Sequence, residues 1–107
     1  MIFSKQFNGR WFKFSLAEQM ANIGAEIGRA INWRDQSKKD SQMFFERGLE
    51  LLDLTIEDPK NRKRLKELLR VREVLADYFY FDNEYGSSDA KWNNYFYGFN
   101  YVANLNK

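Results

Sequence analysis

The fold is expected to depend most on residues 59–83, which read PKNRKRLKELLRVREVLADYFYFDN. This segment begins with a basic run, continues through closely spaced leucine and valine residues, and ends in four consecutive aromatic residues, Tyr78 to Phe81. On a helix, its apolar and aromatic side chains would cover more than half of the circumference, and such a helix must be covered by neighbours on several sides. We therefore expect residues 59–83 to form a single central helix that the rest of the chain surrounds.

The composition favours long helices in a single domain that spans residues 1–107. The chain has only one proline and six glycines, so few positions break a helix. Cysteine and histidine are both absent, which excludes disulfides, thiolate chemistry, and the commonest general base and metal ligand. We find no catalytic constellation and expect neither a metal nor a cofactor. Because no apolar run approaches about 18 residues and no signal-peptide core is present, we expect a cytoplasmic protein without a membrane segment.

Helical spacing of the apolar residues predicts three further helices, at residues 15–35, 38–57 and 88–103. Ser15 and Glu18 have the spacing of a capping box at the start of the first. Ser37 or Asp40 can cap the second helix, and Asp58-Pro59 suits a helix that starts directly after it. Residues 1–14 are expected to form an aromatic arm or a β-hairpin about Asn8-Gly9. The sequence thus predicts an all-α, four-helix bundle with a short N-terminal arm or hairpin.

Within residues 59–83, the position of Arg72 is the hardest to explain by packing. The expected helical phase places it in the middle of the apolar face, where an unpaired guanidinium costs about 3–5 kcal/mol. We expect a carboxylate such as Glu26, Glu50 or Asp77 to meet it. The alternatives are a buried ion pair that fixes helix register, a pocket for an anion, or a side chain that reaches out to solvent.

A basic cluster at the start of the same helix is the candidate nucleic-acid site: Lys60, Arg62, Lys63, Arg64, Lys66 and Arg70. Cations at a helix N-terminus oppose the helix dipole, so helix stability does not explain their placement. Phosphate contacts would explain it, and so would a solvated face partly neutralised by nearby carboxylates. On the preceding helix, Glu46, Glu50, Asp53 and Glu57 form an acidic row that could recruit a divalent cation or face solvent. The basic and acidic clusters could also be two halves of a self-association surface.

Small and aromatic residues supply the candidate interface. Gly24 and Gly28 lie on a stripe of small residues that allows close approach, either by a helix of the same chain or by a second copy. Aromatic residues are concentrated between positions 78 and 101, including all six tyrosines. We expect four of them to be partly exposed, where tyrosine favours protein interfaces and can also stack on unpaired bases: Tyr80, Tyr85, Tyr97 and Tyr101.

Three segments resemble those of small uncharacterised prokaryotic helical-bundle proteins: residues 15–19 (SLAEQ), 45–52 (FERGLELL) and 82–87 (DNEYGS). The helical arrangement of residues 15–103 is also similar to HEPN-type bundles, whose members partner nucleotidyltransferases in toxin–antitoxin pairs or act as ribonucleases. The ribonuclease members use an arginine followed closely by a histidine. Because no histidine follows Arg72, the resemblance does not imply nuclease activity.

These observations favour a non-enzymatic protein-interaction module that self-associates, as a homodimer, or binds another protein. The alternative is an RNA- or DNA-binding protein that uses the basic start of the third helix, as a component of a toxin–antitoxin pair. The two functions differ in their dependence on salt, because binding through phosphate contacts weakens steeply as ionic strength rises.

Overall fold

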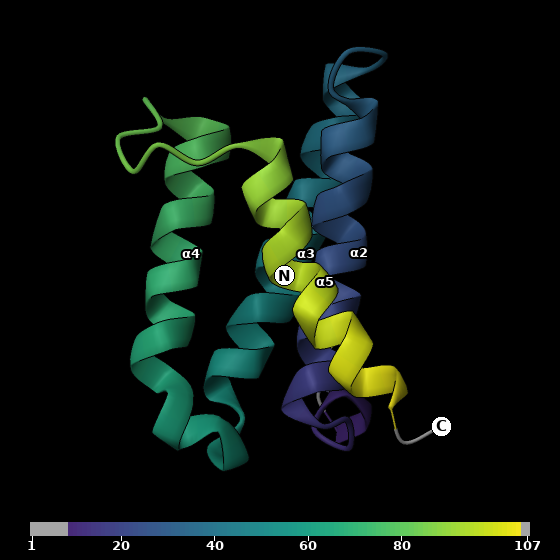
Figure 1. The fold of residues 1–107 in the computed structure, drawn as a ribbon, viewed down its shortest axis with the longest axis vertical. Coiled ribbons are helices and arrows are strands. Elements are labelled where there is room, and N and C mark those ends of the chain that lie inside the picture. The colour runs from purple at the N-terminus through teal and green to yellow at the C-terminus, as the bar shows by residue number, and fades with distance from the viewer. Residues whose placement is uncertain (1–8, 106–107) are drawn as a thin grey trace.

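The computed structural model describes residues 9–105 of the chain. Four long helices and one 3-10 helix make up most of this part: α2 (Leu16–Trp33), α3 (Lys38–Glu57), η1 (Pro59–Arg64), α4 (Leu65–Tyr80) and α5 (Asp89–Asn104) (Figure 1). Among the described residues no strand is present. The all-α prediction is therefore confirmed for residues 9–105.

The N-terminal hairpin is not formed by the residues that can be described. Residues 9–11 are helical and residues 12–14 form a turn, whereas residues 1–8, which include the first half of the predicted hairpin, lie outside the described residues. The turn directs Trp11 inward, where it is 2% exposed. Its indole Nε1 donates a hydrogen bond to Thr55 Oγ1 at 3.0 Å. Contact with α3 thus buries the Trp11 ring and gives its indole N–H a hydrogen-bond partner, without a hairpin.

Side-chain caps set the helix starts, as local sequence rules predict. Ser15 and Glu18 form the capping box: the Ser15 Oγ accepts from the Glu18 amide at 3.1 Å, and Glu18 Oε1 accepts from the Ser15 amide at 2.9 Å. The hydroxyls of Ser37 and Ser88 each accept the amide three residues further on. These bonds satisfy amides that have no partner inside the helix.

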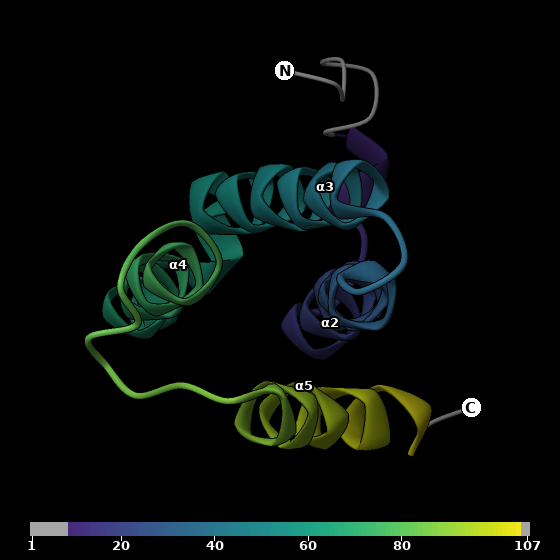
Figure 2. The same ribbon diagram turned by 90° about the horizontal axis from the view of Figure 1, so that it is seen from above.

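The centre of the structure is α2, so the prediction that residues 59–83 form the central helix is wrong. Met20, Ile23, Ile27 and Ala30 of α2 are 0–1% exposed, and α2 packs most extensively against α3 and α5. Seen from above, α4 lies to one side, next to α3 (Figure 2). Large side chains account for this position, because Phe45 of α3 and Phe79 of α4 stack at a centroid distance of 4.2 Å between the two helices.

Residues 59–83 are also not a single rod. The first six form η1, and the α-helix ends at Tyr80. Asn61 accounts for the break, since its side chain is 4% exposed and its amide donates to Gln19 Oε1 at 2.8 Å and to the Thr55 carbonyl at 3.0 Å. The chain turns about this buried amide before α4 begins.

A buried polar junction surrounds that turn and joins four segments of the chain. Gln19 of α2, which is 0% exposed, donates from Nε2 to the Trp11 carbonyl at 3.1 Å and to Asp58 Oδ2 at 2.9 Å. Asp58 is 4% exposed, accepts from the Lys60 amide at 3.1 Å, and forms a short ion pair with the Lys60 ammonium. Burial opposes the charge of Asp58, but its bonds from Lys60 and Gln19 hold its pKa below the ordinary value.

Two glycines allow the close approach of helices to α2 and α3. A Cβ on Gly24 of α2 would lie 2.5 Å from the Cβ of Phe96 on α5, and a Cβ on Gly48 of α3 would lie 2.8 Å from Ile27 Cδ1. The small-residue stripe therefore serves α5 of the same chain at Gly24. Gly28, one turn further on, would meet nothing within 4 Å.

We expect Gly24→Ala to destabilise the protein and Gly28→Ala to stabilise it. The new methyl group at position 24 would collide with the root of Phe96, which cannot swing away, and overpacking of this kind costs about 1–3 kcal/mol. At position 28 the space is open, so alanine should gain about 1 kcal/mol of helix propensity. Urea unfolding of the two variants measures both effects, and equal effects of the two changes would contradict the packing of α5 on Gly24.

Asp58→Asn should make stability less dependent on acid pH. The folded pKa of Asp58 is lowered, so its charge stabilises the fold above the ordinary pKa, and this contribution is lost as pH falls through the folded value. At neutral pH, the loss of charge-assisted bonds should cost about 2 kcal/mol. The difference between wild type and variant should shrink as pH falls from about 5 to about 2. Chemical unfolding at several pH values tests this, and a difference independent of pH would contradict it.

Candidate functional site

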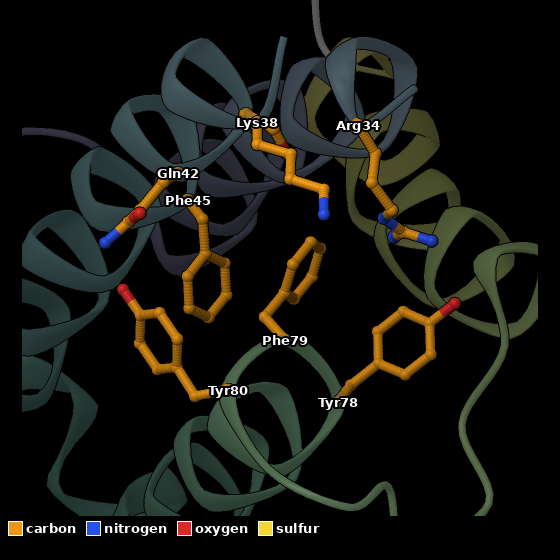
Figure 3. Close-up of a pocket in the computed structure, with 8 residues that line it drawn as sticks. Arg34, Lys38, Gln42, Phe45, Tyr78, Phe79 and Tyr80 are labelled. Carbon is orange, nitrogen blue, oxygen red and sulfur yellow. The ribbon is translucent and has the colours of Figure 1, made fainter. Parts of the chain in front are cut away.

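A cavity of about 380 Å³ opens where α2 ends, α3 begins and α4 ends. Figure 3 shows rings of α3 and α4 along one side of it and two cationic side chains above them. The residues that line this cavity, which we call the aromatic pocket, are Arg34, Lys38, Ser41, Gln42, Phe45, Tyr78, Phe79 and Tyr80. A volume of this size falls in the range that proteins use for small molecules, roughly 300–1,000 Å³.

Arg34 is held rigidly at one end of the aromatic pocket. Its Nη2 donates to Asp89 Oδ1 at 3.0 Å, and its guanidinium carbon lies 5.4 Å from the centre of the Tyr78 ring and 5.3 Å from that of Phe79. The Tyr78 hydroxyl donates a short hydrogen bond to the same Asp89 oxygen. Burial opposes the charge of Arg34, but hydrogen bonds with Tyr78 and Asp89 raise its pKa above the ordinary value. Arg34 therefore stays charged.

The aromatic wall is supported from behind. Phe45 is 1% exposed; it stacks on Phe79 and meets the edge of the Tyr80 ring at 4.9 Å. Burial and, next, the charge of Glu46 raise the pKa of the Tyr80 hydroxyl, which keeps it a neutral hydrogen-bonding group. Tyr78, Phe79 and Tyr80 line the pocket and are all less buried than Phe45.

The second candidate site is the outer face of α4 (Leu65, Leu69, Arg72, Glu73, Ala76 and Phe81). Leu65, Leu69 and Phe81 are 37%, 49% and 73% exposed. Together with residues of the following loop, the C-terminal part of this face lines a groove of about 760 Å³. Asp77 fixes that loop, because its carboxylate accepts the amides of Glu84 at 3.0 Å and Tyr85 at 3.1 Å. The groove therefore has an apolar floor and a rim that carries Glu73, Asp82 and Glu84.

The structure corrects the prediction for Arg72, Glu26 and Glu50. Arg72 lies at the edge of the α4 outer face with its side chain 41% exposed, and it pairs with Asp53 of α3 at 2.6 Å. This pair raises the Arg72 pKa against a smaller effect of burial. The two carboxylates expected beside it lie elsewhere on α2 and α3, and Glu26 pairs with Arg29 at 2.8 Å. The expected phase was wrong because apolar residues surround most of this helix; Leu68, Val71 and Leu75 are the apolar residues that point inward.

Some cations of the basic cluster contact other residues of the chain, and others do not. Lys60 is engaged by Asp58 and by the Phe12 carbonyl, Arg64 pairs with Glu67 at 2.6 Å, and Arg70 lies 4.7 Å from the centre of the Tyr85 ring. Arg62, Lys63 and Lys66 are exposed and have no partner among the described residues. Three of the six cations thus remain available to a partner.

The acidic row on α3 does not form a metal cluster in the described part of the chain. Asp53 is used by Arg72, and Gln42 donates to Glu46 at 3.2 Å. Two of the four carboxylates of the row thus contact side chains of the same protein.

The four candidate tyrosines are all exposed but do not share one surface. Their exposed fractions are 44% for Tyr80, 45% for Tyr85, 66% for Tyr97 and 59% for Tyr101. Tyr80 and Tyr85 lie at the C-terminal end of α4 and just after it, whereas Tyr97 and Tyr101 lie in the C-terminal half of α5 (Figure 1). Gly24 is covered by Phe96 of the same chain, so only Gly28 of the two predicted glycines is open.

Sequence reasoning missed the aromatic pocket. Arg34 ends the first helix and Lys38 begins the second, 40 residues or more before the rings that they face. The four consecutive aromatic residues 78–81 were the visible signal, since four neighbouring rings cannot all point into one core. Nothing in the sequence indicated which cations would meet them.

Searches of family models, curated proteins and solved structures give no match for this chain. The resemblance to HEPN-type bundles therefore stays a prediction. None of the helices in residues 9–105 is both long enough and apolar enough to cross a membrane.

Asp53→Asn should destabilise the protein by less than about 1 kcal/mol, since exposed ion pairs contribute only about 0.2–1 kcal/mol. A buried pair of the kind expected from the sequence would cost about 3–5 kcal/mol when broken. The change lies on α3 and leaves the α4 outer face intact. Chemical unfolding of the variant decides between the two values, and a loss in the upper range would contradict the exposed position of Arg72.

Proposed function

We propose that this chain is a protein-interaction module that self-associates through the outer face of α4. The observation that carries the proposal is the exposed apolar stripe along α4 with opposite charges at its two ends. Leu65, Leu69 and Phe81 are large, apolar and more than one third exposed. Water-exposed apolar side chains that gather on one helix face favour burial against a partner.

The charges at the two ends support a second copy as that partner. Arg62 and Lys63 lie at the start of the stripe, and Asp82 and Glu84 lie at its end. Two copies of α4 that pair in antiparallel fashion about a two-fold axis bring each basic end against the other copy's acidic end. Parallel pairing would place like charges together, so the charge pattern favours the antiparallel arrangement.

The residue spacing fits the antiparallel arrangement. If Leu69 faces Ala76 of the second copy, the axis passes between positions 72 and 73. Leu65 then lies near Phe81 of the other copy. The two helices would pair along their whole length, which is about 22 Å at 1.5 Å per residue. Lys63, in η1 just before one α4, then lies near the loop that carries Asp82 just after the other α4. The basic start of one α4 thus occupies the acidic, apolar-floored groove of the other.

The exposed face of α5 is a weaker candidate. Tyr97, Tyr101, Val102 and Leu105 are 50–66% exposed, but their polar neighbours are mostly asparagines. A face without charge pattern does not favour one partner over another. Nucleic-acid binding, in turn, would depend on Arg62, Lys63 and Lys66, the three cations of the basic cluster that remain free.

A charge swap tests the proposal. In the antiparallel dimer, Lys63→Glu and Asp82→Lys should each weaken association by about tenfold or more, because two symmetry-related attractions become repulsions. The double variant Lys63→Glu/Asp82→Lys should restore association, since opposite charges again face each other. Neither residue has a hydrogen bond or ion pair with another described residue, so the fold should tolerate both changes. Sedimentation equilibrium up to about 100 μM measures the dissociation constants.

Matched substitutions of apolar residues provide the control. Leu69→Glu places a charge beside the axis and should leave a monomer, whereas Tyr101→Glu on α5 should leave association unchanged. A wild-type chain that stays monomeric throughout, or a double variant no tighter than the single ones, would contradict the proposal. If the Tyr101 variant alone dissociates, the dimer forms through α5 instead.

A further inference from the structure

The aromatic pocket holds a cation whose position neither packing nor helix stability explains. Lys38 is the first residue of α3, where a positive charge opposes the helix dipole. Its side chain is exposed and makes no hydrogen bond or ion pair with another described residue. In the close-up, its ammonium group points into the opening, between Arg34 and the rings of α4 (Figure 3). Two positive charges therefore face one end of the cavity.

The other polar groups of the pocket are largely occupied. The Ser41 hydroxyl donates to the Ala30 carbonyl at 2.6 Å, and the Gln42 amide donates to Glu46 Oε1 at 3.2 Å. Asp89 takes one edge of the Arg34 guanidinium. The Lys38 ammonium is thus the strongest free hydrogen-bonding group in the cavity, and only an acceptor, best an anion, can satisfy it.

The remaining surface of the pocket suits a flat apolar body. Phe79 and Tyr80 present rings that Phe45 holds in place by stacking and edge contacts. Edge-to-face contact with such rings contributes beyond the burial of area alone. The Tyr80 hydroxyl lies at the far end from the two cations, and burial and Glu46 raise its pKa.

We propose that the aromatic pocket binds a small aromatic anion. The carboxylate or other acidic group lies between Lys38 and Arg34, and the ring packs against the exposed parts of Phe79 and Tyr80. The site is independent of the α4 outer face, since its cations come from α2 and α3 and its groove opens between α3 and α4. Ligand binding in the aromatic pocket and dimerisation through the α4 outer face can therefore be tested separately, and either can fail without the other.

The test uses 2-naphthoate as the probe, with two reference molecules. 2-Naphthol has the same ring system without the carboxylate, and acetate has the carboxylate without the ring. We expect 2-naphthoate to bind with at least about tenfold higher affinity than either, because only it meets both the ring wall and the cations. Titrations followed by amide chemical shifts in NMR give the affinities and should move the signals of Phe79 and Tyr80 most.

Two neighbouring lysines provide the matched variants. Lys38→Glu reverses the charge in the pocket and should weaken 2-naphthoate binding by at least about tenfold. Lys39→Glu makes the same change one residue on, at a position that does not line the pocket, and should leave binding unchanged. Both changes favour the helix dipole, so loss of folding is not expected. The proposal is wrong if wild type does not bind 2-naphthoate at millimolar concentration, or if the two variants bind it equally well.

Discussion

The hydrogen-bonded carboxylate of Asp58 is the constraint on which the rest of the arrangement depends. It lies at the end of α3, where it accepts from Gln19 of α2 and from the backbone and side chain of Lys60. These bonds fix the direction in which the chain leaves α3. The following six residues then form η1 around the buried Asn61 instead of extending α4. An unpaired carboxylate in this position would be costly, so the junction admits few other geometries.

The direction set by this junction places α4 at the edge of the structure and gives it an inner and an outer face. Its inner face carries Leu68, Val71 and Leu75 toward the rest of the molecule, and its C-terminal rings form one wall of the aromatic pocket. Its outer face is left with apolar residues in water. The groove on that face is lined by residues of α4 and the following loop. A second copy is the partner that the charges at its ends favour.

The parts of the fold that could be predicted from sequence are those decided by local chemistry. The capping serines at positions 15, 37 and 88 mark helix starts because their hydroxyls satisfy amides within the same turn. The phase of α4 could not be predicted in this way. A helix that is apolar around most of its circumference has no single inward face, and Arg72 was placed in the core for that reason. The break at η1 depends on Gln19, 42 residues before Asn61, a contact that no local pattern reveals. The pocket cations Arg34 and Lys38 were likewise invisible, since the rings that they face lie on another helix.

Native-state hydrogen exchange can measure whether α4 lies at the edge of the structure. The experiment uses a concentration at which the chain is monomeric, so that no partner protects the α4 outer face. The slowest amides should belong to α2, around Ile23 and Ile27, and those of α4 should exchange faster because fewer neighbours cover them. If the amides of α4 exchange as slowly as those of α2, then α4 is a central helix and the account is wrong.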